Sequence, residues 1–250
     1  MDLDMTNIEK KCIYKYMILL VLLLFFQGSV FAQTMPEWYI PLREAVYEQQ
    51  LSANEIAPLY REISARARTE LSGASQLIML SRCEYMMGRA YLFEERKEEA
   101  AARFGDGMDY AQRALNVRES AEAWVMLAEN LSQSCVVRSV AFAMANGLNV
   151  EKYSKNALAM NNRNAAASIM IASRWVYAPS PFHNYRRGIE MMSAILTGCD
   201  MEKDDMFNVN LAIGYAYVQM RNSAQARPWL TRALEIYPTN RYVQTLIAGL

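Results

Sequence analysis

Apolar residues recur with the period of an α-helix along almost the whole chain after residue 34. They stand three or four positions apart, as one buried face of a helix requires, and no useful length of sequence alternates apolar and polar residues as a half-buried strand does. Helices joined by short turns favour antiparallel neighbours, so the pattern predicts an all-α fold. The predicted helices lie at residues 35–50, 55–71, 75–94, 97–116, 119–134, 148–160, 163–177, 184–198, 205–221, 223–236 and 240–250.

One helix carries a clear start signal. In Ser52-Ala53-Asn54-Glu55, a hydroxyl and a carboxylate three positions apart have the spacing of a capping box, which satisfies the free amides of a new helix. We therefore expect a helix to begin directly after Ser52.

A different pattern occupies the N-terminus, where residues 17–26 read MILLVLLLFF without a polar residue. Lysines precede this run, and Val30-Phe31-Ala32 follows it with the small residues at −3 and −1 that a signal peptidase needs. The sequence predicts a secretory signal peptide over residues 1–32 and a periplasmic or secreted mature chain without a membrane span. An uncleaved inner-membrane anchor is the alternative, although the apolar run is short of the about 20 residues that span a bilayer.

Between residues 210 and 238, small and large residues follow a spacing suited to two closely packed antiparallel helices. Small residues stand where the helices approach, larger ones fill the groove between them, and a proline opens the next turn. These residues are Ile213, Gly214, Tyr217, Ala226, Leu230, Ala233 and Pro238. The spacing resembles the 34-residue tetratricopeptide repeat, and only Asn210 departs from it, because the family has Trp at that position.

Three upstream segments resemble weaker copies of the same unit. The matching residues are Gly88, Tyr91, Ala100 and Phe104 in the first, Trp124, Leu127, Ala128 and Ala157 in the second, and Ala172, Trp175 and Gly188 in the third. Residues 135–149 then form an insertion within the second copy. The resemblance implies antiparallel helix pairs stacked into a tetratricopeptide-like α-solenoid over residues 74–250, preceded by an N-terminal helical cap over residues 33–73.

The resemblance also implies where a partner binds. In this family, partners usually dock on the concave side, against the first helix of each pair. Carried onto the matched units, the partner-binding positions are Arg82, Tyr85, Arg89, Glu129, Gln133, Ser173, Tyr177, Tyr215 and Gln219, with Phe93, Ser132 and Asn208 at equivalent positions. Arg and Tyr are well represented in this set, and both residue types often dominate the binding energy of an interface.

The charge of the chain is balanced, with 26 Lys and Arg residues against 26 Asp and Glu residues. Such a balance gives neither the basic field that attracts nucleic acid nor a polybasic membrane footprint. We therefore expect a protein or peptide partner, or a small ligand, and no nucleic acid.

Residues that could carry catalysis are sparse. His183 is the chain's single histidine; it would be the only imidazole base for a Ser or Cys nucleophile, and we interpret it as a loop residue. The acidic residues in 200–205 precede a predicted helix, where carboxylates favour the positive helix N-terminus, so we interpret them as caps. The sequence predicts no enzyme, no cofactor and no metal site.

Three cysteines follow the predicted signal peptide: Cys83, Cys135 and Cys199. Their odd number and wide spacing predict neither a disulfide framework nor a zinc site. We interpret them as small buried thiols. Whether any two are oxidised stays open.

The leading hypothesis is an exported, non-enzymatic scaffold that binds a protein or peptide partner through its concave groove. The alternative is a periplasmic subunit that binds a small ligand, similar to the tetratricopeptide subunits that accompany some TRAP-type transporters. An open face with exposed aromatic residues would favour the first hypothesis, whereas an enclosed pocket with converging polar groups would favour the second.

Overall fold

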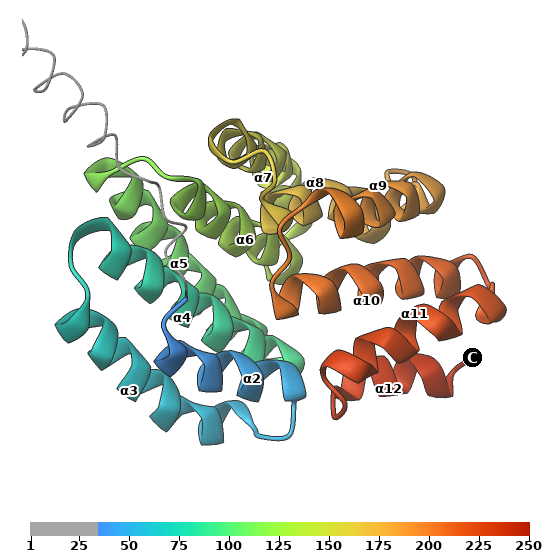
Figure 1. Cartoon of the computed structure of the whole chain (residues 1–250), viewed down its shortest axis with the longest axis horizontal. Helices are drawn as coiled ribbons and strands as arrows, with labels where there is room; N and C mark the ends of the chain where they lie inside the picture. Colours follow the sequence, from blue (N-terminus) through green and yellow to red (C-terminus); the bar gives the residue numbers. More distant parts are fainter. Residues whose placement is uncertain (1–34) are drawn as a thin grey trace, which may run out of the picture. The chain divides into compact units, whose positions relative to one another are not determined.

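The computed structural model describes residues 35–250, of which Trp38–Leu250 form one compact unit. The signal peptide predicted over residues 1–32 lies outside the described residues. Apart from an isolated bridge between Asn164 and Asp200, every regular element in the described range is helical (Figure 1), which confirms the all-α prediction. The elements are η1 Glu37–Tyr39, α2 Ile40–Glu48, α3 Ala53–Glu70, α4 Gly73–Phe93, α5 Lys97–Val117, α6 Ala121–Val137, α7 Val140–Met160, α8 Ala165–Tyr177, α9 Tyr185–Gly198, α10 Lys203–Gln219, α11 Ser223–Ile236 and α12 Arg241–Ala248.

Side-chain caps fix where many of these helices begin. The capping box predicted at Ser52 and Glu55 is present at the start of α3. Other starts have a Ser or Asn oxygen that accepts a hydrogen bond from a backbone amide in the first turn, each worth about 0.5–2 kcal/mol. These residues are Ser120, Ser139, Asn164, Asn184, Asn222 and Asn240.

The helices pack as successive pairs. Helix α4 packs on α5, α6 on α7, α8 on α9, and α10 on α11. The first helices of the pairs also contact one another in the order α4, α6, α8, α10. Figure 1 shows this arrangement of neighbouring helix pairs, followed by α12. The predicted stack of helix pairs is confirmed.

Glycines allow the two helices of a pair to approach closely, as the repeat spacing predicts. A Cβ atom on Gly214 would lie 2.6 Å from Leu230 Cδ2, and one on Gly88 would lie 2.5 Å from Phe104 Cε1. Both distances are shorter than a van der Waals contact. Each glycine and its large partner therefore form one packing unit, and a larger residue at either glycine would push the helices apart.

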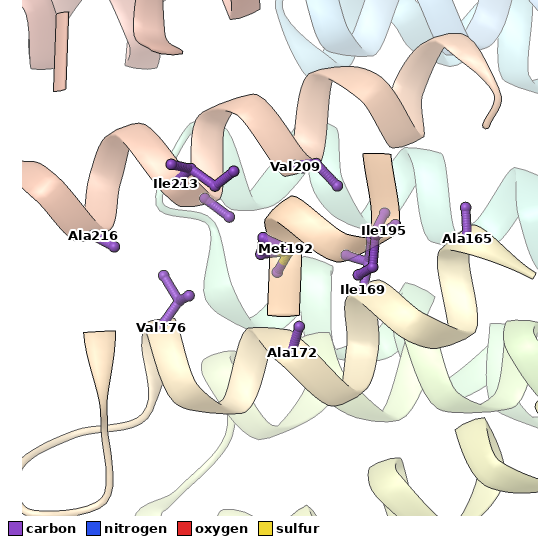
Figure 2. Close-up of a cluster of buried hydrophobic side chains, with 10 residues drawn as sticks. Ala165, Ile169, Ala172, Val176, Met192, Ile195, Val209, Ile213 and Ala216 are labelled. Atoms are coloured by element: carbon purple, nitrogen blue, oxygen red, sulfur yellow. The ribbon is translucent and has the colours of Figure 1, made fainter. Parts of the chain in front are cut away.

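The core between the third and fourth pairs shows how these faces interlock. Met192 and Ile195 of α9 lie among apolar residues of α8 and α10 (Figure 2). Ile169 and Ile213 come from those two helices, and all four side chains are buried. Apolar residues at helical spacing here form a core, as predicted, and hold α8 beside α10.

Helix α7 differs from the prediction. We expected an insertion over 135–149 and a helix from residue 148, but α7 begins at Val140 and runs unbroken to Met160. Gly147 sits inside this helix with no neighbouring atom within 4 Å of where its Cβ would be. The Ser139 hydroxyl accepts a hydrogen bond from the Phe142 amide and starts the helix two turns earlier. The residues of the predicted insertion therefore form the end of α6, a short turn and the first turns of α7.

Candidate functional site

Helix α2 lies against the inner face formed by α4 and α10, where Tyr47 joins the first helix pair to the last. Arg89 Nη1 donates to the Tyr47 hydroxyl at 2.7 Å, and Asn208 Nδ2 donates to the same oxygen at 3.1 Å. The Tyr47 ring also stacks on Tyr237, with ring centroids 4.8 Å apart, and meets Phe207 edge-on at 5.4 Å. In Figure 1, α2 lies beside α4. One side chain of α2 thus connects three other helices or turns.

Charged residues hold the first turns of α2 to the start of α10. Arg43 Nη1 lies 3.3 Å from a carboxylate oxygen of Glu202 and 3.3 Å from one of Asp204. Lys203 pairs with Glu44 beside them. Because the Arg43 side chain is almost completely buried, removing its partners would leave a buried charge without compensation. The pairing therefore fixes the position of α2 against α10.

The end of α2 is held by the turn before α12. Asn240 Nδ2 donates to the Tyr47 carbonyl at 2.7 Å, and Thr239 Oγ1 donates to the Glu48 carbonyl at 2.8 Å. The Tyr242 amide donates to Gln49 Oε1 at 3.2 Å. The carbonyls at the end of a helix lack partners within it, so these bonds satisfy groups that would otherwise need water. Both ends of α2 are therefore attached to the last repeat.

Some of the predicted partner-binding residues are consequently covered. Tyr85 is only 4% exposed, and Asn208 is engaged with Tyr47. Arg89 is partly exposed, but its guanidinium lies over the Tyr47 ring at 4.4 Å and donates to its hydroxyl. We call the region of Tyr85, Arg89 and Asn208 the filled half of the inner face. Helix α2 engages Arg89 and Asn208 through Tyr47, and Tyr85 is buried beside Phe104 of α5.

Acidic side chains of α6 and α10 face the arginines of α4 across the inner face. Burial raises the pKa of Glu129 to about 8, and the nearby Arg82 only partly opposes that effect. Burial also raises the pKa of Asp205 to about 7, and the adjacent charge of Asp204 adds to the shift. Neither Arg82 nor Glu129 forms a hydrogen bond or ion pair with residues of the described range. The interior therefore contains an arginine charge without a fixed partner, beside a Glu129 carboxyl that its raised pKa keeps mostly protonated at neutral pH.

The other predicted residues lie where α2 does not reach. Tyr177 at the end of α8 is 47% exposed, and its ring centroid lies 5.2 Å from that of Tyr215 on α10. Tyr242 of α12 is 44% exposed and close enough to both tyrosines to influence their ionisation. Phe93 at the end of α4 is 40% exposed, and the Arg89 guanidinium lies over its ring, 5.3 Å from the centroid. We call Phe93, Tyr177, Tyr215 and Tyr242 the aromatic patch.

A cavity of about 520 Å³ adjoins this patch. It lies between the turn after α2, the end of α4 and the start of α12, and Phe93 and Tyr242 line it. Leu51 adds an apolar side chain, while Gln49 and Arg241 add polar ones. The aromatic patch therefore borders a cavity that is large enough to hold several side chains.

The remaining predicted groove residues, Gln133, Ser173 and Gln219, are at least partly exposed on α6, α8 and α10. No pattern in the sequence indicated that Arg43, Tyr47 or Tyr242 belongs to the site. They lie outside the matched first helices, and their contacts reach across 159 to 193 residues. No local pattern encodes such pairings.

Candidate catalytic residues lie apart from this site. His183 stacks on Tyr185, with ring centroids 4.4 Å apart, in the turn before α9. Asp205 accepts a hydrogen bond from the Glu202 amide at 3.0 Å and caps α10, as predicted. Among residues 35–250, no three His, Cys, Asp or Glu side chains are grouped as metal ligands would be.

The three cysteines are free thiols in the described range. Cys83 is buried, as expected, and burial raises the pKa of its thiol to about 12. Cys135 and Cys199 are only partly buried. In the same range, no helix combines the length and the apolar character needed to cross a bilayer.

The architecture is that of a helical-repeat protein. Its helices form pairs with close glycine contacts between paired helices, and the first and last units both contribute to its inner face. Comparison with known proteins gives the kind of repeat. Residues 207–240, which cover most of α10 and all of α11, match the family model of the tetratricopeptide repeat. The last helix pair thus matches a tetratricopeptide repeat, as the sequence predicted, and this fold is typical of protein-interaction scaffolds.

A solved structure with a similar backbone path is described as "Crystal structure of YrrB: a TPR protein with an unusual peptide-binding site". It is 15% identical to this chain, the match covers 84% of this chain and 98% of that chain, and the TM-score is 0.37. No curated protein matches the sequence.

Proposed function

We propose that this chain is an exported, non-enzymatic scaffold that binds a protein or peptide partner through the open half of its inner face. The aromatic patch carries the proposal. Its rings remain 40–47% exposed at Phe93, Tyr177 and Tyr242, although the neighbouring filled half buries Tyr85. Exposed aromatic residues that gather in one place beside a cavity are typical of a binding surface.

The residue types in the patch suit a protein partner. Tyrosine buries a large apolar ring on binding and keeps a hydroxyl for a hydrogen bond, at a small cost in side-chain freedom. Arg89, held by its hydrogen bond to Tyr47, adds a guanidinium over the ring of Phe93. Export rests on the signal peptide predicted over residues 1–32 and places the partner in the periplasm or outside the cell.

The proposal is tested by a pull-down with residues 33–250 from an envelope extract of the host. The test variant replaces Tyr177, Tyr215 and Tyr242 by Ala. Tyr85 is left unchanged, because it is buried and its loss would disturb the fold. Phe182→Ala is the matched control, since Phe182 is 62% exposed but lies in the turn between α8 and α9. We expect a protein that the wild type and the control retain and the triple variant loses. A partner retained by the triple variant would contradict the proposal.

A second candidate function is the binding of a small polar ligand. Arg82 and Glu129 favour it, because both are partly exposed inside the inner face and neither has a hydrogen-bond or ion-pair partner in the described range. A ligand with one negative group and one hydrogen-bond acceptor would complement them, because the raised pKa of Glu129 keeps this residue mostly protonated at neutral pH. Native mass spectrometry of the purified chain tests whether a small ligand is bound. The wild type should then show the added mass of the ligand, and the variants Arg82→Met and Glu129→Gln should lack it.

A further inference from the structure

We propose that the outward face of α7 docks on the surface of a bilayer that contains anionic lipids. No residue of this face belongs to the aromatic patch, so the inference does not depend on the partner proposed there. Two features of the described residues carry it. One is a row of exposed apolar side chains on α7, and the other is an excess of basic residues in the part of the chain that contains them.

The first half of α7 carries the most exposed large apolar side chains of the described residues. Val140, Met144 and Leu148 are 77%, 80% and 69% exposed and follow one another at intervals of four residues, so they lie along one side of the helix. Val150, two positions after Leu148, is on the other side and is buried. No Lys, Arg, Asp or Glu occurs from residue 139 to residue 150. We call Val140, Met144 and Leu148 the apolar ridge.

Basic residues accompany the apolar ridge, although the chain as a whole is neutral. Residues 138–198 contain seven Lys and Arg residues and two acidic ones, a net charge of +5, so the rest of the chain carries −5. The exposed Arg138 stands just before α7. The overall balance of charge therefore hides a local excess. Positive charge beside exposed apolar side chains is the combination that an anionic bilayer surface attracts.

Lysines continue the apolar ridge along α7. Lys152 follows Leu148 by four residues, is exposed, and forms no ion pair with another residue of the range 35–250. Lys155 and Arg174 both pair with Glu151, at 2.8 Å and 2.9 Å, so two cations share one carboxylate. The second half of this face is therefore positive, and its side chains are long enough to reach lipid phosphates while the apolar ridge enters the bilayer.

The two features together favour a bilayer over a second copy of the chain. A two-fold pairing of the apolar ridge with itself would bring two surfaces of the same positive charge together. A bilayer also requires no matching shape. The space around the ridge is open, since a Cβ atom on Gly147 would have no neighbour within 4 Å. Side chains that stand out from a helix in this way can enter the boundary between lipid headgroups and acyl chains.

The test is sedimentation of residues 33–250 with vesicles of phosphatidylcholine, either alone or mixed with phosphatidylglycerol. This range omits the apolar run of residues 17–26, which would itself enter a bilayer. We expect the chain to sediment only with the mixed vesicles, and less as the salt concentration rises, because salt screens the charges. The double variant Met144→Ser/Leu148→Ser should weaken binding about tenfold, and Lys152→Gln about fivefold.

Two residues of α5 supply the matched controls. Val117 is 59% exposed, Lys97 is also exposed, and both lie outside the basic region. Val117→Ser and Lys97→Gln should therefore leave vesicle binding unchanged. Circular dichroism melting of each variant shows whether it is folded, so that lost binding is not confused with lost structure.

Three results would overturn the inference. Equal binding to neutral and mixed vesicles would show that the charge excess has no part in docking. Binding that survives in both the double variant and Lys152→Gln would place the docking surface elsewhere. If the chain sediments with neither kind of vesicle, α7 does not dock on lipid, and sedimentation equilibrium would show whether it joins two copies instead. None of these results affects the proposed function, because the pull-down with the tyrosine variant tests a different surface.

Discussion

The filled half and the aromatic patch are two parts of one inner face, and they differ in how far their side chains are exposed. Tyr85 and Tyr177 are both predicted groove residues, yet Tyr85 is 4% exposed and Tyr177 is 47% exposed. The Tyr85 ring lies within the first helix pair, beside Phe104 and the Arg89 guanidinium, whereas Tyr177 stands at the end of α8. A tyrosine at a groove position therefore indicates a binding residue only where the chain's own residues do not bury it. Four predictions test this contrast, from the largest expected effect to the smallest.

Tyr47→Ala should cost the most stability. The change removes a buried ring that packs on Tyr237 and Phe207, together with the hydroxyl that Arg89 and Asn208 bind. Replacing a buried aromatic residue by Ala typically costs about 3–5 kcal/mol. The free energy of unfolding, measured by urea denaturation, should fall by that amount. A loss below about 1 kcal/mol would show that α2 is not an integral part of the fold.

Arg43→Ala should have the next largest effect. Glu202 and Asp204 lose their shared partner, and hydrogen bonds to charged groups contribute about 1.5–3 kcal/mol. Lys155→Ala is the matched control, because Lys155 forms an exposed ion pair with Glu151 within one helix, and such pairs contribute about 0–1 kcal/mol. Equal losses in the two variants would mean that the pairing of α2 with α10 resembles an ordinary surface contact.

Glu129 should make the stability of the filled half depend on pH. Its folded-state pKa is raised to about 8 from an ordinary value of 4.5, so the folded chain holds a proton that the unfolded chain has lost. The stabilisation is therefore complete below about pH 4.5 and is lost as the pH rises through about 8.

Because Glu129 is partly exposed, solvent reduces the energy below the about 4 kcal/mol that the full pKa shift would give between pH 5 and pH 9. The wild type should therefore lose about 1–2 kcal/mol more than Glu129→Gln, which cannot ionise. Urea denaturation at both pH values measures the difference. Identical pH profiles for the two proteins would show that Glu129 is solvated like a surface carboxylate, and the interior would then be wetter than its burial indicates.

The helix pairs could be predicted from the sequence because their determinants are local. Gly88 and Gly214 stand at fixed distances from Phe104 and Leu230, and the spacing alone indicates their contacts. Ser52 likewise marks the start of α3 within four residues. Such features repeat along the chain or lie within one turn, so they leave a pattern that can be read without a structure.

The position of α2 against α4 and α10 could not be predicted in the same way. Its bonds join Arg43 and Tyr47 to residues about 160 positions away, through hydroxyls, amides and charges that have no periodic spacing. The expectation for Tyr85 met the same limit, because this residue fits a groove position but is buried. Tertiary packing overrides the sequence pattern there.

Tyr177→Ala should have the smallest effect on folding and the clearest effect on binding. The side chain is almost half exposed and packs mainly against the Tyr215 ring, so the free energy of unfolding should change by no more than about 0.5 kcal/mol. The same variant should lose the partner that the wild type captures. This combination, set beside a severe loss of stability in Tyr47→Ala, would separate the structural tyrosines of the filled half from the exposed ones of the aromatic patch. A destabilisation above about 2 kcal/mol would place Tyr177 in the core instead, because the transfer of a buried ring to water is what costs that much.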